Sequence, residues 1–382
     1  MEKYIYADNA ATTKLDIDAF EAMKPYMLEE YGNASQPYSF SKKPKMVIKQ
    51  ARKDIAECIG AEQNEIYFTS GGTESDNWAI KEFGFATDIR HIITSNIEHH
   101  AILRTCEVES KNGKCDVQYL HADRNAIINP GDLQKILQKP SDAVASCETT
   151  LVSVMFANNE VGTIQQIAEL CKITHDHGAI FHTDAVQAVG HVAINVRKLG
   201  IDLLSASAHK FNGPKGIGFL YVKKGFLAPM HMGGAQERGK RAGTENVPAI
   251  VGMSIALKKN CEEIDMNSKH LKNLEEALIT KLRGANIDFI RNGINQLPGN
   301  ISLSFAYVEG EMLLHRLDLK KICISTGSAC DGVNTQISHV IKAMGVSEKY
   351  AKGTIRISFG KNNTLDETQR IAEEIISILH QR

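Results

Sequence analysis

Hydrophobic residues in the first two thirds of the chain fall into short apolar runs separated by segments with helical spacing. Residues 41–60 show the helical pattern, because apolar positions recur every three to four residues and Gly60 can end the helix. Strands are predicted over 65–69, 92–94, 117–120, 151–156, 180–182, 203–206 and 217–222. Because helical segments such as 164–177 lie between most of these runs, the pattern predicts an α/β fold, a mostly parallel sheet covered by helices.

The last third of the chain has a different pattern. Residues 247–283 contain few Gly or Pro residues and predict one or two long helices. Strands are predicted near Phe289 and over 301–305, 322–325 and 354–358, followed by an amphipathic helix over 365–380. This arrangement predicts a smaller α+β domain. We therefore expect a segment that packs with the small domain (1–15), a large domain (16–255) and a small C-terminal domain (256–382).

The composition argues against several classes of protein. The 382 residues carry 44 Lys and Arg against 45 Asp and Glu, so the net charge of −1 predicts no nucleic-acid or anionic-membrane partner. No apolar run approaches the roughly 18 residues of a membrane helix, and the charged start does not resemble a secretion signal. The eight cysteines form no C-x-x-C pair and no zinc-finger spacing, so they predict free thiols in a reducing cytoplasm and no metal site.

One glycine pair is a candidate anion site. The motifs GxGxxG and GxxxxGK[ST] are missing, which argues against a Rossmann dehydrogenase or a P-loop enzyme. Gly71-Gly72, however, follows a predicted strand and opens a helix, whose first N–H groups and positive dipole end can bind an anion. Thr73 and Asp76 also resemble a capping box, so a well-capped tight turn is the alternative interpretation.

Two more polar residues follow predicted strands. Asp184 and Lys210 each stand where an apolar run ends, and ligands of α/β sheets bind outside the carboxyl ends of the strands. Asp184 would be an ordinary helix cap or a partner for a ring nitrogen. Lys210 would be an ordinary surface lysine, or its small neighbours would desolvate it, lower its pKa and make it a nucleophile. An anion site, a carboxylate and a lysine together are what pyridoxal phosphate (PLP) requires.

The chain resembles the cysteine desulfurases of the NifS/IscS type, which are class V aminotransferases among the fold-type I PLP enzymes. Matching strings run in one order from DNAATT (8–13) to TIRIS (354–358) and cover nearly the whole chain. Between them lie FTSGGTESDN (68–77), ITSNIEHHA (93–101), ANNEVGTI (157–164), FHTDAVQAVG (181–190), SASAHKFNGPKGIG (205–218), ERGKRAGTEN (237–246) and STGSAC (325–330). The resemblance implies the fold-type I architecture.

The resemblance also implies roles for individual residues. Lys210 would bind the cofactor aldehyde and move the substrate Cα proton, and Asp184 would pair with the pyridine nitrogen. Gln187 would bond the ring hydroxyl, and His99 would stack on the ring and assist proton transfer. The residues expected at the phosphate are Gly72, Thr73, Ser207, His209 and, across a homodimer, Thr244. Those expected at the substrate carboxylate are Asn159 and Arg356. Without the resemblance, His99, Asn159 and Arg356 would be ordinary helix-start, turn and surface ion-pair residues.

Cys330 decides the type of reaction. It precedes the polar stretch DGVNTQ, which predicts an exposed loop, whereas buried cysteines usually have apolar neighbours. The resemblance implies that its thiolate attacks the sulfur of cofactor-bound L-cysteine and carries it as a persulfide to an iron–sulfur scaffold or another sulfur acceptor. Two positions depart from close relatives. Asp331 disfavours the neighbouring thiolate, and Ala235 stands where relatives often have His.

We therefore expect a cytoplasmic, homodimeric, PLP-dependent cysteine desulfurase that forms L-alanine and supplies sulfur for iron–sulfur cluster assembly or for tRNA or cofactor thiolation. Two alternatives stay open. One is a selenocysteine lyase or another class V lyase or transaminase, which keeps the cofactor and changes the chemistry. The other is a sulfur-relay subunit without turnover, against which the intact set of Lys210, Asp184 and Cys330 argues.

Overall fold

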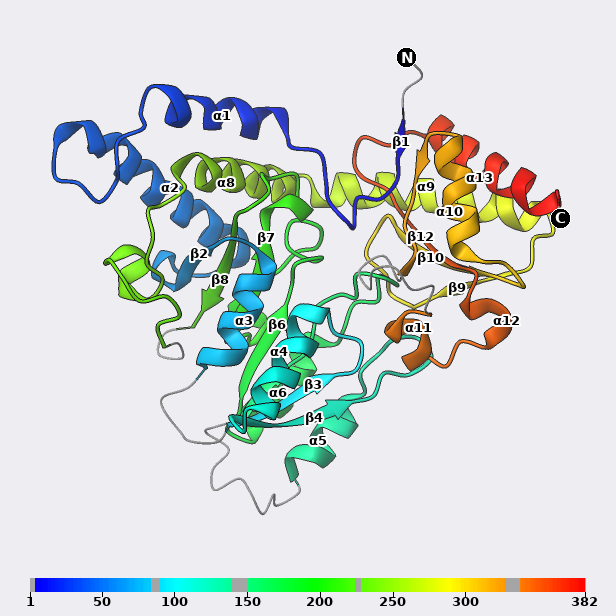
Figure 1. Ribbon diagram of the computed structural model, residues 1–382, viewed down its shortest axis with the longest axis horizontal. Coiled ribbons are helices and arrows are strands. Elements are labelled where there is room, and N and C mark those ends of the chain that lie inside the picture. Colours follow the sequence, from blue (N-terminus) through cyan, green and yellow to red (C-terminus); the bar gives the residue numbers. More distant parts are fainter. Residues whose placement is uncertain (1–3, 84–89, 139–149, 224–227, 328–336, 382) are drawn as a thin grey trace.

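The computed structural model describes residues 4–83, 90–138, 150–223, 228–327 and 337–381. Figure 1 shows a larger α/β part and, beside it, a smaller part that contains the C-terminal third of the chain. The N-terminal segment runs between them. Neither part contains, among these residues, a helix long and apolar enough to cross a membrane.

A seven-stranded sheet in the order β2-β8-β7-β6-β5-β3-β4 forms the centre of the larger part. Its strands are β2 (Ile66–Thr69), β3 (Arg90–Ser95), β4 (Cys115–Leu120), β5 (Thr150–Ser153), β6 (Ile180–Asp184), β7 (Leu203–Ser207) and β8 (Gly218–Val222). The pairs β4-β3, β3-β5, β5-β6 and β6-β7 are parallel, while β8 is antiparallel to both neighbours. The predicted mostly parallel sheet is confirmed.

Helices cover both faces of this sheet. They are α2 (Lys42–Ile59), α3 (Gly72–Glu82), α4 (His100–Lys111), α5 (Pro130–Gln138), α6 (Ile167–Asp176), α7 (Val196–Leu199) and α8 (Val247–Glu262), and α1 (Ile17–Leu28) packs on α8. Helix α2 agrees with the prediction, because its periodic apolar face is buried and Gly60 ends it with a φ of 69°. Helix α6 begins later than predicted, since Ile164 instead forms a β-bridge with Ala157.

The smaller part is a three-stranded antiparallel sheet with helices packed on it. Its strands are β9 (Phe289–Asn292), β10 (Asn300–Phe305) and β12 (Thr354–Ser358), in the order β12-β10-β9. Helices α9 (Ile264–Gly284), α10 (Gly310–Leu319) and α13 (Leu365–His380) share its apolar core, and α12 (Glu348–Ala351) contacts β10. Buried residues of α11 (His339–Ala343) instead join the core of the larger part. Helix α13 has the predicted bounds and begins with a capping box at Thr364 and Glu367. The domain limits at residues 15 and 255 stay a prediction.

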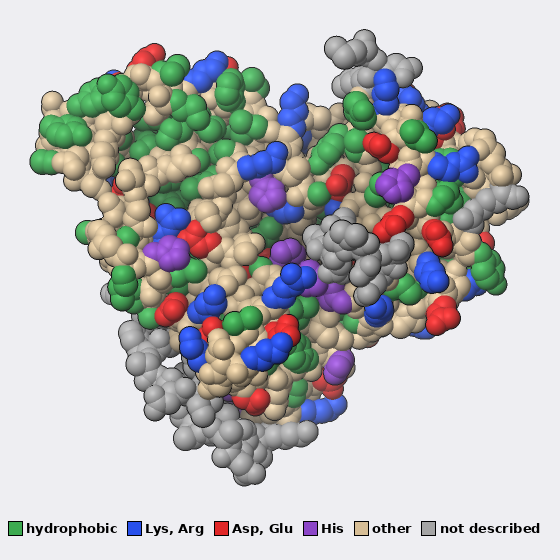
Figure 2. All heavy atoms as spheres, viewed as in Figure 1, with side chains coloured by type: hydrophobic (Ala, Val, Ile, Leu, Met, Phe, Trp, Pro, Cys, Tyr) green, Lys and Arg blue, Asp and Glu red, His purple; other side chains and the backbone are tan. Residues whose placement is uncertain are grey.

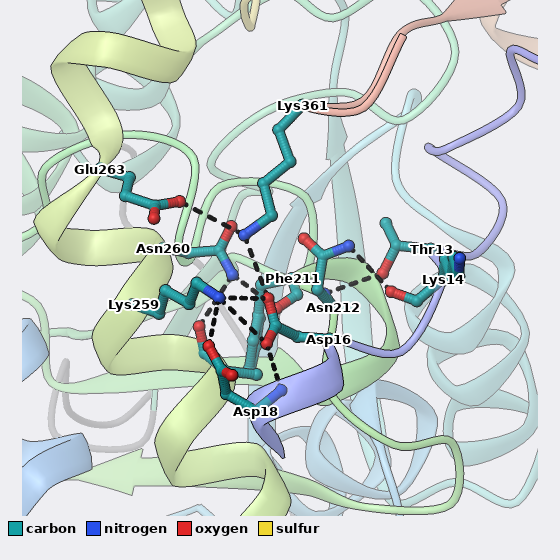
Figure 3. A network of polar contacts seen from close by, with 11 residues as sticks. Thr13, Lys14, Asp16, Asp18, Phe211, Asn212, Lys259, Asn260, Glu263 and Lys361 are labelled. Atoms are coloured by element: carbon teal, nitrogen blue, oxygen red, sulfur yellow. Dashed lines mark hydrogen bonds and ion pairs between the residues drawn. The ribbon is translucent and has the colours of Figure 1, made fainter. Parts of the chain in front are cut away.

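The N-terminal segment joins the two parts. Strand β1 (Ile5–Tyr6) pairs in parallel with β11 (Ile322–Cys323) of the smaller part. Further along, Asp16 accepts ion-pair contacts from Lys259 at 3.1 Å and Lys361 at 3.4 Å, as Figure 3 shows. In the same network Asn212 Nδ2 donates to the Lys14 carbonyl at 2.9 Å. This network fixes the backbone just after the position of the predicted lysine nucleophile.

Candidate active site

A cavity of about 590 Å³ lies at the carboxyl ends of β6 and β7, with residues of both parts in its wall. This is the edge of a parallel sheet at which ligands bind. The predicted site residues in its wall are Gly72, Thr73, His99, Asn159, Asp184, Gln187, Ser207, His209, Lys210 and Arg356. Thr244 is exposed on the loop before α8 and lies outside this wall. Cys330 lies outside the described residues.

The glycine turn forms the anion-binding end of the cavity. Gly71 has a φ of 152°, and a Cβ at Gly72 would lie 2.5 Å from Val186 Cγ2, so both positions require glycine. Helix α3 begins at Gly72 without a side-chain cap, which leaves its first N–H groups for an anion. The predicted capping box is wrong, because the N-cap is Gly71 and Asp76 is instead buried in the cavity wall.

Asp184 lies at the end of β6 and is 5% exposed. Its Oδ1 accepts a hydrogen bond from the Val186 backbone N–H at 2.9 Å. Burial raises the pKa of this carboxyl, although His99, the Val186 N–H bond and Lys210 act in the opposite direction. A carboxyl in this setting binds a proton readily, and it suits a ring nitrogen with which it can share that proton.

Two further buried carboxyl groups lie near Asp184. Burial raises the pKa of Glu98 to about 8 and raises the pKa of Asp76 well above its ordinary value, and the charge of Asp184 adds to both shifts. Like charges repel one another strongly at a site shielded from water. The cluster of Asp76, Glu98 and Asp184 therefore favours a single negative charge over two or three. Local patterns indicated no role for Glu98 and only a helix-capping role for Asp76.

His99 presents a neutral ring to the cavity. It is the N-cap of α4, and its Nδ1 accepts from the Ala101 backbone N–H at 3.1 Å, which assigns the ring proton to Nε2. Burial lowers the pKa of His99, an effect that Asp184 partly opposes. The ordinary helix-start role considered from the sequence is therefore real, and it holds the imidazole in one orientation at the cavity wall.

Lys210 and Gln187 converge on the same stretch of the N-terminal segment. Lys210 Nζ donates to the carbonyls of Ala10 and Ala11 at 2.7 and 2.8 Å. Gln187 Nε2 donates to the Ala10 carbonyl at 3.0 Å. Close by, His209 contacts Thr12 through Nδ1 at 3.1 Å, and burial lowers the pKa of His209 to about 4. Lys210, the candidate nucleophile that follows β7, thus lies in the cavity wall and is not an ordinary surface lysine.

Arg356 is 7% exposed, so the surface ion-pair interpretation of this residue is wrong. Its Nη2 pairs with Asp8 Oδ1 at 2.7 Å, and its Nη1 donates to the Asn159 carbonyl at 3.0 Å. Its Nε is buried and has no partner in the described part of the chain. A guanidinium at the cavity wall that Asp8 and the Asn159 carbonyl hold in one orientation is suited to bind a carboxylate. Asp8 was not predicted, although it begins the DNAATT match.

Comparison with known proteins identifies the family. The model of the class V aminotransferases matches residues 5–371. The chain belongs to the class V aminotransferase family. It is 46% identical to cysteine desulfurase IscS of Dictyoglomus turgidum, covering 99% of this chain and 97% of that protein. It is also 46% identical to IscS of Methanosarcina thermophila, covering 99% and 92%.

Solved structures agree with this class V aminotransferase assignment. A NifS-like protein superposes with a TM-score of 0.89 at 35% identity, covering 100% of both chains. The structure described as SspA in complex with cysteine gives a TM-score of 0.80 at 34% identity, covering 94% of this chain and 100% of that one. The predicted resemblance to NifS/IscS cysteine desulfurases and the predicted fold are confirmed, and PLP is the cofactor of this family.

The cavity of this class V aminotransferase fits PLP. The glycine turn packs closely on Val186, and a side chain at Gly72 would collide with the Val186 side chain. Around it stand donors for a phosphate, a buried carboxyl for a ring nitrogen, and an amine for an aldehyde. The residues that would hold each end of the cofactor therefore come from separate strands and meet at one edge of the sheet.

Proposed function

We propose that this chain is a PLP-dependent cysteine desulfurase that converts L-cysteine to L-alanine and forms a persulfide on Cys330. The observation that carries the proposal is the convergence of Asp184, Lys210 and Arg356 on one cavity. These residues supply a partner for a ring nitrogen, a reactive amine and a carboxylate-binding cation. The relatives named cysteine desulfurase IscS support the same reaction.

PLP, when bound, supplies the electron sink for the electron pair left at the substrate Cα. The uncapped start of α3 with Thr73, Ser207 and His209 would hold the phosphate, and Asp184 would hold the proton of the ring nitrogen. Gln187 would bind the ring hydroxyl, and the neutral imidazole of His99 would contact the ring. Arg356, held by Asp8 and by the carbonyl of Asn159, orients the substrate through its carboxylate.

Lys210 moves the proton at the substrate Cα, and Cys330 accepts the sulfur. In the overall reaction the Cβ–S bond of L-cysteine breaks and an S–S bond to Cys330 forms. The two electrons that leave the Cys330 sulfur and the substrate sulfur reduce Cβ to the methyl group of L-alanine. One of the two thiol protons goes to Cβ, and the other remains with the persulfide. Because atoms and electrons balance between L-cysteine and the enzyme thiol, no further oxidant is required.

The test of this function is product analysis of the PLP-loaded enzyme. With L-cysteine and a thiol reductant we expect L-alanine and sulfide in equal amounts over many turnovers, without any keto acid. A requirement for a keto acid would identify a transaminase. Turnover of selenocysteine but not of cysteine would identify a selenocysteine lyase. Formation of no L-alanine at all would favour the sulfur-relay subunit.

We also propose a homodimer. Exposed apolar side chains gather over α1, the following loop and the start of α2, at the upper left of Figure 2. They are Ile17, Phe20, Met27, Leu28, Tyr31, Tyr38, Phe40 and Met46. Such a contiguous apolar surface is typical of a protein–protein interface. Thr244 is exposed and lies outside the wall of its own cavity, and in the proposed dimer it contacts the phosphate of the partner subunit's cofactor. Arg241, on the same loop, pairs with Glu74 of α3 at 2.9 Å.

Charging this apolar surface is expected to separate the subunits. Leu28 and Tyr31 are 74% and 70% exposed, so Leu28→Asp/Tyr31→Asp should not disturb the core of the subunit but should place charge in a dry interface. We expect a dimer for the wild type and a monomer for the variant in sedimentation velocity, with weaker retention of PLP in the monomer. Leu319→Asp, at an 82% exposed position of α10, is the control and should stay dimeric. A wild-type monomer would refute the dimer.

The proposal extends to the destination of the sulfur. A persulfide is a transferable group that a reducing compartment preserves against further oxidation. We therefore place the enzyme in the cytoplasm and assign its product to a protein acceptor, either an iron–sulfur scaffold or another sulfur carrier.

A further inference from the structure

Glu160 is a buried carboxylate beside the substrate site, and the mechanism above does not use it. It follows Asn159 directly and is 6% exposed. The backbone N–H groups of Glu160 and Val161 donate to Asn158 Oδ1 at 2.9 and 3.0 Å, and Asn158 Nδ2 donates to the Ile97 carbonyl at 3.0 Å. The turn that carries Asn159 and Glu160 is therefore fixed within the larger part.

The Glu160 carboxylate contacts Gly327 and Ser338, two residues of the C-terminal third of the chain, through one oxygen. Oε2 accepts a hydrogen bond from the Ser338 hydroxyl at 2.5 Å, and Ser338 in turn caps α11 by accepting from the Val340 N–H at 3.0 Å. Gly327 packs on the same oxygen, because a Cβ there would lie 2.4 Å from Glu160 Oε2 and 3.2 Å from Ser338 Cβ. Glu160, Ser338 and Gly327 thus form one close cluster.

Gly327 and Ser338 border the sequence 328–336, which contains Cys330. Gly327 also lines the cofactor cavity together with Ser325, and Ser325 exchanges two backbone hydrogen bonds with Arg356 at 3.0 and 2.7 Å. Arg356 itself donates to the Asn159 carbonyl at 3.0 Å. Glu160 therefore connects both borders of the sulfur-accepting sequence to the turn that helps to hold the substrate-binding arginine.

We propose that Glu160 is a positioning residue that fixes the two borders of the Cys330 sequence relative to the bound substrate. The inference rests on the proposed sulfur transfer to Cys330. That transfer requires an aligned approach of the thiolate to the substrate sulfur, and a displacement of about 1 Å at a reacting group can cost about 100-fold in rate. The named contacts of Glu160 include neither Asp184 nor Lys210, so we expect its loss to act on sulfur transfer and not on cofactor binding.

Replacement of Glu160 tests this role. In Glu160→Ala we expect the kcat for L-alanine formation to fall by about 10- to 100-fold, with persulfide formation on Cys330, read by mass spectrometry, falling in parallel. The KM for L-cysteine and the affinity of the apo chain for PLP should stay within about threefold of the wild type. Glu160→Gln retains an oxygen that accepts from Ser338 and should recover most of the rate. Glu169→Ala, at an exposed position of α6, is the control.

A second variant tests the same contact from the opposite side. Gly327→Ala would place a methyl group against Glu160 Oε2 and should also lower kcat. In the Glu160→Ala background that oxygen is gone, so the added methyl should cost little, and the double-mutant cycle should be strongly non-additive. Additive losses, or a loss of PLP affinity in Glu160→Ala as large as the loss of kcat, would overturn the inference alone. A wild type that forms no persulfide would overturn the proposed function together with it.

Discussion

Replacing Cys330 by serine is expected to abolish L-alanine formation from L-cysteine, with a loss of at least about 100-fold, because the hydroxyl cannot take over the sulfur. The cofactor and substrate residues lie on other elements, so the variant should still bind PLP and should still shift its visible absorbance when cysteine is added. The measurement pairs single-turnover L-alanine yield with mass spectrometry of the persulfide. Cys323→Ser, at a half-buried cysteine of β11, is the matched control and should retain activity.

The same variant separates the two PLP reactions that the sequence left open. Selenium leaves more easily than sulfur and needs no enzyme thiol. A Cys330→Ser enzyme that still releases selenium from selenocysteine, while it fails on cysteine, supports the desulfurase assignment. Full sulfide release from cysteine by this variant would show that Cys330 is not the acceptor.

Replacing Lys210 by alanine is expected to lower turnover by about 1,000-fold, within the range for loss of a positioned proton-transfer group. Lys210 Nζ lies in the cavity, 2.7 Å from the Ala10 carbonyl, where it can reach both an aldehyde and a substrate proton. The variant should also lose the covalent attachment of PLP. In the wild type, borohydride reduction should add the mass of the cofactor at Lys210, and in the variant it should add none.

The controls for Lys210 separate charge from chemistry. Lys210→Arg keeps the positive charge but cannot form the covalent bond or serve as a base, so it should be as inactive as the alanine variant. Lys198→Ala, at an exposed position of α7, should behave like the wild type. Activity near the wild-type level in Lys210→Arg would show that the lysine supplies charge alone.

Local patterns predicted the elements that bring the cofactor residues to the cavity. The apolar periodicity of α2 and α13 is a property of neighbouring turns, and the glycine turn before α3 depends on backbone conformations that few other residues adopt. The position of Asp184 and Lys210 at strand ends followed from the same alternation of strand and helix. The motif match predicted which residues act in the reaction, because apolar periodicity contains no information about the reactivity of a side chain.

Two alternative interpretations taken from local motifs were wrong because of tertiary packing. Thr73 and Asp76 have capping-box spacing, yet the N-cap is Gly71, two residues before Thr73, and Asp76 is buried in the cavity wall. Arg356 has the alternating pattern of an exposed strand position but is covered by Asp8 and the turn at Asn159. In both cases the burial of a polar side chain depends on what packs over it.

The class of fold and the family follow from the sequence alone, which also predicts the residues that carry the chemistry, because periodicity, turn residues and motif strings are local. How those residues act on one another depends on tertiary packing: the neutral ring of His99, the raised pKa of Asp184, the buried pair of Arg356 with Asp8, and the contact of Glu160 with Ser338. The Arg356–Asp8 pair joins the smaller part to the N-terminal segment, and the Glu160–Ser338 contact joins the larger part to the C-terminal third of the chain. Burial and distance there are set by how the parts pack, and no local pattern records that packing.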